Sequence, residues 1–387
     1  IGIGHGNNFR ECEEQAAQAL DMALGRGGDQ VAIKKKDNSF QFFGGISNSN
    51  EKRTRVRTRI VASALLELIN NSDQVVLMGH KFADLDCFGS AFALCSTIRK
   101  HTDTPAIIAM DKKTALVHSL FERITSLGGD LMVTDYRSIE HLITKNTLLI
   151  VLDTHRCQML EYADILNKVD NVVVIDHHRK SVDHIANSVI FYHETSASSA
   201  SEMVCELLQY ISEKSVGRAE AEALLSGIML DTKNYCINTG VRTFEASAFL
   251  RRRGADPLAV KKLFADTIEN YKDKNAIIST AEQYKNYAIA INENTDLPIY
   301  KSRIISSQAA DELLNVLGVK ASFVMSRIDD EINISARSYG EINVQLIMEN
   351  LGGGGHRTMA ACQLNETDFS LAKQLLLNAI DKNEEDN

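Results

Sequence analysis

The sequence predicts an α/β protein in which an open, mostly parallel sheet flanked by helices is followed by a smaller α/β unit. Short apolar runs alternate with helical patterns between residues 56 and 255. Several of these runs are continuous, such as the one at 172–175, which is typical of parallel strands buried on both faces. The chain of 387 residues is also long enough for two or three domains with separate cores.

Residues 1–45 are predicted to form a small unit of their own. Apolar residues at helical spacing predict an amphipathic helix over about 12–24, and the glycine-rich stretch at 25–29 predicts a turn before a strand at 30–34. A unit of this size rarely buries a complete core, so we expect it to be the end of a truncated domain. Basic residues crowd into 46–60 without aromatic residues between them, which favours a solvated linker over a nucleic-acid patch.

The central region, residues 61–256, is expected to hold the parallel sheet. Apolar runs that predict strands alternate here with stretches of helical periodicity. The predicted strands are 74–79, 106–110, 147–153, 171–176 and 188–192, and the predicted helices between them include 90–99 and 197–213. A helical connector with one long helix is expected over residues 257–287.

Residues 288–381 are predicted to form the second, smaller unit, in which strands and helices are again mixed. The predicted strands are 288–291, 321–328, 332–337 and 359–364, and the predicted helices are 309–317, 344–350 and 371–380. The acidic tail at 382–387 is expected to be disordered, because its charged residues leave little apolar surface to bury.

The composition restricts the class of partner. The net charge of −9 argues against a protein that coats long nucleic acid, because neutralising phosphates requires clustered Lys and Arg. A small anionic substrate remains open, since bound metal ions can invert the charge of a pocket. The sequence leaves the oligomeric state open, although α/β units with an accessory domain often form homodimers.

The cysteines and the apolar runs indicate the compartment. There are seven cysteines and no CxxC pair, which favours a reducing, cytoplasmic compartment over a disulfide framework. No apolar run approaches the ~18 residues of a membrane span, so we expect no membrane contact by this part of the protein. The chain begins at Ile1 without a Met. We therefore expect a fragment of a longer protein that is anchored to a membrane through other segments.

Acidic residues and histidines follow the predicted strands at the points where these strands end. They come from four separate segments: His80, Asp84 and Asp86; Asp153; Asp176, His177 and His178; and Asp231 at the end of a helix. The carboxyl ends of parallel strands form one ligand crevice, so the side chains should meet there. A single Asp in such a place is usually a turn or helix-capping residue. Several carboxylates together repel one another unless cations bind between them, and with imidazoles they suit ions such as Mn²⁺.

These motifs resemble the DHH phosphoesterase superfamily. The resemblance is carried by His80-x-x-x-Asp84-x-Asp86-x-x-Gly89-Ser90, by Asp153, by Asp176-His177-His178 and by Asp231. The segment Gly352-Gly353-Gly354-Gly355-His356 resembles the signature of the accessory DHHA1 domain. Residues 1–45 resemble the end of a degenerate GGDEF domain, a module that precedes DHH and DHHA1 in GdpP-type proteins. The resemblance covers most of the chain; one departure is Ala83, where the family would have Pro.

The resemblance implies a role for each motif residue. His80 and Asp84 would bind a first metal ion, Asp86, His177 and Asp231 a second, and Asp153 would bridge the two. Asp176 would orient the site and His178 would face the substrate phosphate. Gly352, Gly353, Gly354, Gly355 and His356 would bind substrate. Arg337 ends a predicted strand of the same unit, and we expect it to reach a phosphate oxygen as a bidentate cation rather than to be a surface residue. Outside the motifs, His155 is interpreted as a supporting or surface residue and His193 as a surface residue.

The resemblance also implies the reaction. We expect a cyclic-di-AMP phosphodiesterase of bacterial signalling that forms linear 5′-pApA. It would use two divalent metal ions, for which Mn²⁺ is the expected metal, and a hydroxide that bridges them as the nucleophile. The alternative is a short-oligonucleotide nuclease (nanoRNase) or 3′,5′-bisphosphate nucleotide phosphatase of the same superfamily. A dinucleotide sensor without catalysis is a third hypothesis, which the intact set of ligands disfavours.

Overall fold

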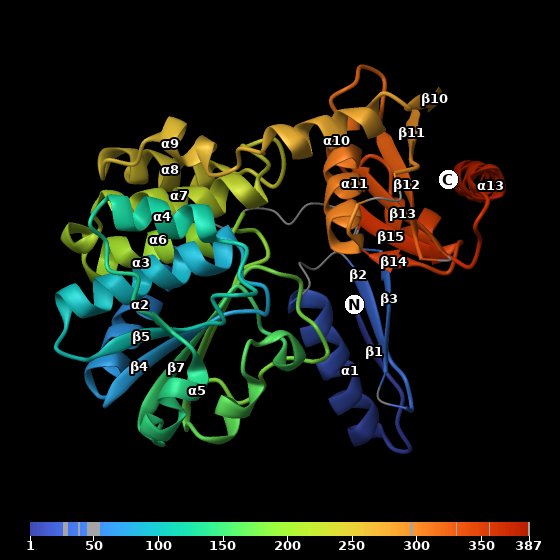
Figure 1. Ribbon diagram of the computed structural model, residues 1–387. Coiled ribbons are helices and arrows are strands. Elements are labelled where there is room, and N and C mark those ends of the chain that lie inside the picture. Colours follow the sequence, from blue (N-terminus) through green and yellow to red (C-terminus); the bar gives the residue numbers. More distant parts are fainter. Residues whose placement is uncertain are drawn as a thin grey trace. The chain divides into compact units, whose positions relative to one another are not determined.

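The computed structural model describes residues 1–25, 30–37, 39–44, 55–294, 297–329, 331–355 and 357–385. The chain divides into two compact units, residues 1–264 and 265–387. Both contain helices and strands, and the first contains a six-stranded sheet in which every strand pair is parallel (Figure 1). The predicted α/β class is therefore confirmed.

The N-terminal segment forms a three-stranded sheet with one helix. The order is β1 (Gly2–Gly4), β2 (Gln30–Lys34) and β3 (Phe40–Gly44), and Ala19 and Ala23 of helix α1 (Phe9–Gly25) pack on Ala32. The helix lies so close to β1 that a Cβ on Gly4 would meet the Ala16 backbone nitrogen at 2.2 Å. The predicted helix and strand are present, and β3 was not predicted. Of the turn predicted at 25–29, Gly25 belongs to α1, and residues 26–29 lie outside the described residues.

The central sheet has six parallel strands in the order β6-β5-β4-β7-β8-β9. Their bounds are β4 (Gln74–Met78), β5 (Ala106–Ala109), β6 (Val133–Thr134), β7 (Thr147–Leu152), β8 (Asn171–Asp176) and β9 (Ile190–His193). Each predicted strand is present within about two residues, and the two-residue β6 was missed. The order changes direction between β4 and β7, and in open α/β sheets ligands bind outside the carboxyl ends of the strands at such a point.

Helices cover both faces of this sheet. They are α2 (Arg55–Asn70), α3 (Leu85–His101), α4 (His118–Ser126), α5 (Tyr136–Ile139), α6 (Ala200–Ile211), α7 (Arg218–Asp231), α8 (Val241–Arg252) and α9 (Pro257–Lys262), with 3₁₀ turns at Glu140–Leu142, Cys157–Met159, Ala163–Asn167 and Glu213–Ser215. Leu77 and Ile150 pack in the core that contains α3 and α7, whereas Val76 and Val151 pack in a second core with α5. Alternate residues of each strand thus bury both faces, which explains the continuous apolar runs.

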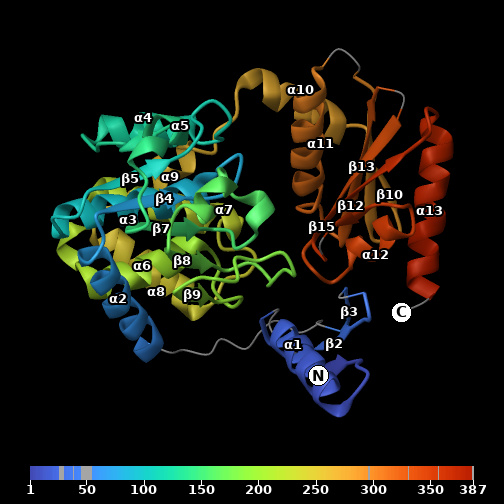
Figure 2. The same ribbon diagram turned by 90° about the horizontal axis from the view of Figure 1, so that it is seen from below.

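The second unit is built on a mixed sheet in the order β10-β11-β12-β13-β15-β14. The strands are β10 (Glu282–Tyr284), β11 (Tyr287–Asn292), β12 (Ala321–Ile328), β13 (Glu331–Ser338), β14 (Gly354–Gly355) and β15 (Met359–Leu364). The helices are α10 (Ile268–Ile278), α11 (Ile299–Leu313), α12 (Val344–Glu349) and α13 (Phe369–Glu385). Helix α11 covers one face, while α12 and α13 cover the other (Figure 2). The β11–β12 pair is parallel and the other pairs are antiparallel.

Three predictions about connecting segments were wrong in part. The linker ends earlier than residue 60, because α2 begins at Arg55; residues 46–54 lie outside the described part. The connector contains two helices, since Thr267 caps a new helix after α9 ends, and β10 follows. The acidic tail is helical to Glu385, where Asp381 and Glu384 each accept a hydrogen bond from Lys285 at 2.7 Å. Composition could not show these contacts, because Lys285 belongs to another element.

None of the described helices is both long enough and apolar enough to cross a bilayer. The expected membrane anchor concerns segments other than these and stays a prediction.

Candidate metal centre

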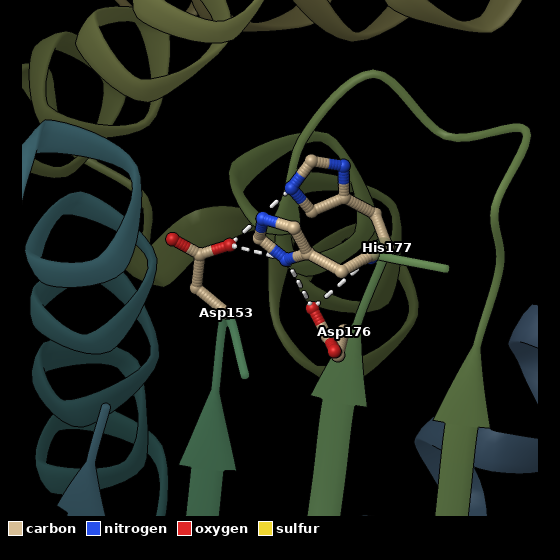
Figure 3. Close-up of side chains that lie close together, drawn as sticks. Asp153, Asp176 and His177 are labelled. Carbon is tan, nitrogen blue, oxygen red and sulfur yellow. Dashed lines mark hydrogen bonds and ion pairs between the residues drawn. The ribbon is translucent and has the colours of Figure 1, made fainter. Parts of the chain in front are cut away.

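Three neighbouring strands of the central sheet end at one cluster of carboxylates and imidazoles. His80 follows β4, Asp153 follows β7, and Asp176 is the last residue of β8, with His177 and His178 directly after it. Asp153, Asp176 and His177 converge where their strands end (Figure 3). Two helices complete the cluster: Asp84 and Asp86 lie at the start of α3 and Asp231 is the last residue of α7. The sheet edge predicted from the sequence therefore brings these residues together.

The two oxygens of Asp153 face two different groups of side chains. Asp153 Oδ2 lies 3.3 Å from His80 Nε2, and the same nitrogen lies 3.9 Å from Asp84 Oδ1. Asp153 Oδ1 lies 3.3 Å from His177 Nε2. His177 Nε2 in turn lies 3.1 Å from Asp231 Oδ2 and 3.9 Å from Asp86 Oδ2. Asp153 is thus shared by two groups, each of which contains one imidazole and at least one further carboxylate.

The start of α3 explains how two of the carboxylates are held. Asp84 is the N-cap of α3, and its Oδ1 accepts hydrogen bonds from the backbone N–H groups of Asp86 and Cys87 at 3.0 Å. Asp86 is fully buried and accepts the first N–H groups of α6, from Ala200 at 2.7 Å and Ser201 at 2.8 Å. Asp84 and Asp86 thus both accept N–H groups at the start of a helix, as a single Asp in such a place usually does. Both carboxylates also lie in the cluster.

Two backbone features allow this close assembly. A Cβ on Gly227 of α7 would meet Asp86 Oδ1 at 2.4 Å, so α7 can approach the cluster only with glycine at this position. Asp153 has a φ of 59°, in the left-handed region that non-glycine residues rarely adopt. Its N–H donates to the carbonyl of Ile175 at 3.0 Å, which fixes the turn. A strained backbone of this kind, which costs about 1–3 kcal/mol, is most often found at functional sites.

The pKa values of the clustered carboxylates indicate that the site would be stabilised by a positive charge. Burial raises the pKa of Asp84 to about 6, and the neighbouring Asp153 and Asp231 act in the same direction. Burial also raises the pKa of Asp86 well above its usual value. For Asp153 burial acts upward, but the contacts with His177 and His80 outweigh it and lower the pKa to about 2. The negative charge of Asp153 is thus stabilised, whereas burial and the neighbouring carboxylates disfavour the negative charges of Asp84 and Asp86. Bound cations would stabilise all three carboxylates as anions.

The residues present fit a divalent metal ion. Asp153 Oδ1 and His177 Nε2 are buried, and neither has a hydrogen-bond partner among the described residues. Buried polar atoms are otherwise nearly always paired. A cation between these atoms would satisfy both of them, and a set of carboxylates with a minority of imidazoles suits hard or borderline divalent ions.

A second layer of side chains holds His178. Asp176 Oδ1 accepts from the His178 backbone N–H at 3.2 Å and lies 2.9 Å from His178 Nδ1. Asp176 Oδ2 pairs with Nδ1 of His155, which is buried and accepts the Ser181 N–H at Nε2 at 2.8 Å. Since Nε2 of His155 is an acceptor, its Nδ1 carries the proton and donates to Asp176. His155 is therefore a supporting residue. The feature of the sequence that pointed to this role was its position two residues after Asp153.

The prediction that His193 is a surface residue was wrong. His193 is partly buried, and its Nε2 contacts the carbonyl of His178. Its ring also lies 5.5 Å from the ring of His155. Burial lowers the pKa of His193 to about 4, so the ring is neutral at physiological pH and can donate from Nε2. A histidine within an otherwise ordinary strand carried no sequence signal for this contact.

Apart from His178, the predicted substrate residues lie in the second unit. Arg337, on β13, has a side chain that is only 14% exposed, and its Nε lies 3.4 Å from Asp311 Oδ1. Gly354 and Gly355 form β14 and pair with Ala361 and Ala360.

The glycine segment also has a packing role. A Cβ on Gly353 would meet the Ala361 carbonyl oxygen at 2.3 Å, so this glycine is required for packing as well. Gly352 has a φ of 80°. His356 lies outside the described residues.

Comparison with known protein families identifies three segments. Residues 74–228 match the DHH family, N-terminal domain, and residues 294–383 match the DHHA1 domain. Residues 1–41 match the GGDEF domain of cyclic-di-AMP phosphodiesterase GdpP-like proteins. The predicted DHH domain, DHHA1 domain and GGDEF-type segment are therefore confirmed.

Two curated relatives and one solved structure agree with this. The chain is 42% identical to the cyclic-di-AMP phosphodiesterase GdpP of Geobacillus thermodenitrificans over 98% of its own length and 58% of the relative. It is 41% identical to the cyclic-di-AMP phosphodiesterase PdeA of Listeria monocytogenes, with the same coverage of 98% and 58%. The chain thus spans about three-fifths of these relatives. An exopolyphosphatase-related protein from Bacteroides fragilis shares the fold, with 19% identity, a TM-score of 0.68 and coverage of 84% and 96%.

Proposed function

We propose that this chain, which belongs to the DHH family and also carries a DHHA1 domain, hydrolyses cyclic-di-AMP to linear 5′-pApA with two divalent metal ions. The observation that carries the proposal is the placement of a histidine and carboxylates on either side of Asp153, with one oxygen of Asp153 toward each group. The identity of 41–42% with two cyclic-di-AMP phosphodiesterases supports this choice of substrate.

The contacts support the ligand sets that the resemblance implies. His80 and Asp84 would hold one ion, and Asp86, His177 and Asp231 would hold the other, with Asp153 shared between them. Mn²⁺ fits the mixture of carboxylates and imidazoles best. The chemistry that two such ions supply when bound is activation of a bridging water as the attacking hydroxide and neutralisation of charge on the phosphate oxygens.

His178 is the side chain best placed to meet the scissile phosphate. Its Nδ1 is directed to Asp176, which leaves Nε2 free for a substrate, and the side chain is 56% exposed. Burial acts to raise the pKa of Asp176, but hydrogen bonds from His155 and His178 lower it well below its usual value. Asp176 therefore stays ionised and keeps His178 in one orientation. Burial acts to lower the pKa of His178, but the contact with Asp176 raises it. The imidazolium, with a proton on each nitrogen, can then donate Nε2–H to a phosphate oxygen.

The second unit would supply the remaining contacts to the substrate. Arg337 offers a guanidinium that can bind a phosphate in competition with Asp311. The N–H groups of Gly352 and Gly353 already donate to the carbonyls of Glu349 and Met348. The glycine segment at 352–355, together with His356, would therefore bind the substrate through close approach of a backbone without side chains.

The test is a product analysis. The chain is incubated with Mn²⁺ and, separately, with cyclic-di-AMP, pApA and 3′,5′-bisphosphorylated adenosine, and the products are separated chromatographically. We expect cyclic-di-AMP to be converted to pApA, with little further hydrolysis, and a chelator to stop the reaction. Rapid consumption of pApA or of the bisphosphate with cyclic-di-AMP intact would favour the nuclease or phosphatase alternative instead.

A further inference from the structure

We propose that Phe82 forms a stacking surface for a nucleobase of the substrate at the rim of the metal centre. The proposal rests on the proposed phosphodiesterase function and adds the part of the substrate that this residue binds. Phe82 lies in the short loop between β4 and α3, between the candidate ligands His80 and Asp84. Its side chain is 61% exposed, although an apolar ring of this size gains most from burial.

The backbone on either side of Phe82 is anchored to the rest of the unit. The Lys81 N–H donates to the carbonyl of Met159 at 2.9 Å. On the other side, Ala83 is buried, and its carbonyl accepts the N–H of Leu116 at 2.9 Å. The exposure of the ring is therefore set by a fixed loop.

The backbone conformation of Phe82 is itself unusual. Its φ is 58°, in the left-handed region that suits glycine or asparagine and disfavours a bulky side chain. Asp153, at the same sheet edge, adopts a φ of 59°. In Asp153 this conformation accompanies a carboxylate shared by two groups of ligands. At position 82 it holds an aromatic ring toward solvent, where the ring contributes little to the core, so we infer that the ring serves a ligand.

The place of Phe82 in the chain selects the kind of ligand. Phe82 is two residues from both His80 and Asp84, so its Cα lies within about 7.6 Å of theirs. A phosphodiester held at the metal centre carries a nucleoside on either side of phosphorus, which places a base within reach of such a ring. Aromatic side chains stack on bases without strong preference for their identity, because every base has a flat π-face. Phe82 would therefore strengthen binding of a nucleotide and leave the choice of base to other residues.

The test separates the base from the phosphate. The chain is assayed for hydrolysis of bis(p-nitrophenyl) phosphate with Mn²⁺. Inhibition of this reaction by adenosine 5′-monophosphate is compared with inhibition by ribose 5-phosphate, which carries the same phosphate and sugar without a base. We expect the unmutated chain to favour the nucleotide. We expect Phe82→Leu to reduce that preference by about tenfold, a typical effect of losing one base–aromatic stack. Inhibition by ribose 5-phosphate and thermal stability should stay unchanged.

Two further variants control for the change of side chain. Phe82→Tyr keeps a planar ring and should keep the preference for the nucleotide. Tyr210→Leu removes another aromatic side chain, 44% exposed, near the end of α6 opposite the residues that hold Asp86, and should have no effect.

Three results would overturn the proposal. An unchanged preference in Phe82→Leu, with normal hydrolysis by the unmutated chain, overturns the base contact and leaves the phosphodiesterase function intact. An equal loss of inhibition by both compounds assigns Phe82 to the positioning of His80 instead. Absence of any Mn²⁺-dependent hydrolysis by the unmutated chain overturns the proposed function and this inference with it.

Discussion

The two sheets of this protein carry their candidate functional residues in different ways. In the first unit all strand pairs of the six-stranded sheet are parallel, so the chain emerges from β4, β7 and β8 at the same edge and delivers His80, Asp153 and Asp176 together. In the second unit β13 runs antiparallel to both β12 and β15, so the ends of neighbouring strands alternate between opposite edges. A parallel sheet converts residues at strand ends into a cluster, whereas a mixed sheet does not.

The two regions also differ in the kind of buried polar atom that lacks a hydrogen-bond partner. Among the described residues of the metal centre these are Asp153 Oδ1 and His177 Nε2, two atoms that can both bind a cation. In the second unit Arg337 Nε also lacks a hydrogen-bond partner among the described residues, but it belongs to a cation itself and lies 3.4 Å from Asp311 Oδ1. We therefore expect changes at the first region to abolish the reaction and changes at the second to adjust substrate binding.

The largest expected effect is that of Asp153→Asn. Asparagine keeps the shape but replaces one ligand oxygen by an amide nitrogen, so one group of side chains loses its shared ligand. Substitution of residues that only support the metal ligands typically lowers metal affinity or activity by about 10–100-fold. Because Asp153 is itself a proposed ligand, we expect its substitution to lower activity by more than about a hundredfold. Steady-state rates with Mn²⁺ and the metal content of the purified protein measure it.

Asp170→Asn is the matched control for this change. Asp170 directly precedes β8, at the end of the strand opposite Asp176, and is exposed. It should retain full activity and metal. Normal activity and metal content in Asp153→Asn would instead show that Asp153 is not the shared ligand.

A smaller loss is expected for Asp176→Asn. The substitution weakens the contacts with His178 Nδ1 and His155 Nδ1 and so frees the orientation of His178. We expect kcat to fall by about 10–100-fold, with the metal content close to normal. If metal is lost as completely as in Asp153→Asn, Asp176 belongs among the ligands, and the division into an inner set and a supporting layer is wrong.

The smallest effect is expected in the second unit, for Arg337→Ala. Loss of one charge-assisted contact to a phosphate should raise KM by about tenfold, or about 1.4 kcal/mol, and leave kcat nearly unchanged. Arg337→Lys should recover part of the affinity. Asp311→Asn frees the guanidinium from its partner and should leave KM unchanged or lower it. A fall in kcat as large as that of Asp176→Asn would break the contrast between the two regions.

Much of the first unit was predictable from local patterns. Continuous apolar runs marked β4, β5, β7 and β8 within a few residues, because a strand buried on both faces can hold few polar side chains. Short or edge elements such as β3 and β6 were missed, since a few residues carry little periodicity. The helical tail was mispredicted, because contacts with Lys285 stabilise Asp381 and Glu384 in a way that composition cannot reveal.

The order of apolar and polar residues along the chain was enough to predict which residues emerge from the buried strands, and hence that Asp153, His177 and their neighbours share one edge. The pairing of these side chains depends on how distant elements pack. Asp86 accepts the N–H of Ala200, which is 114 positions away, and Asp176 pairs with His155, which is 21 positions away. The physical reason is that strand and helix patterns record burial of the local chain, whereas side-chain pairing depends on strand order and on which helices pack against each other.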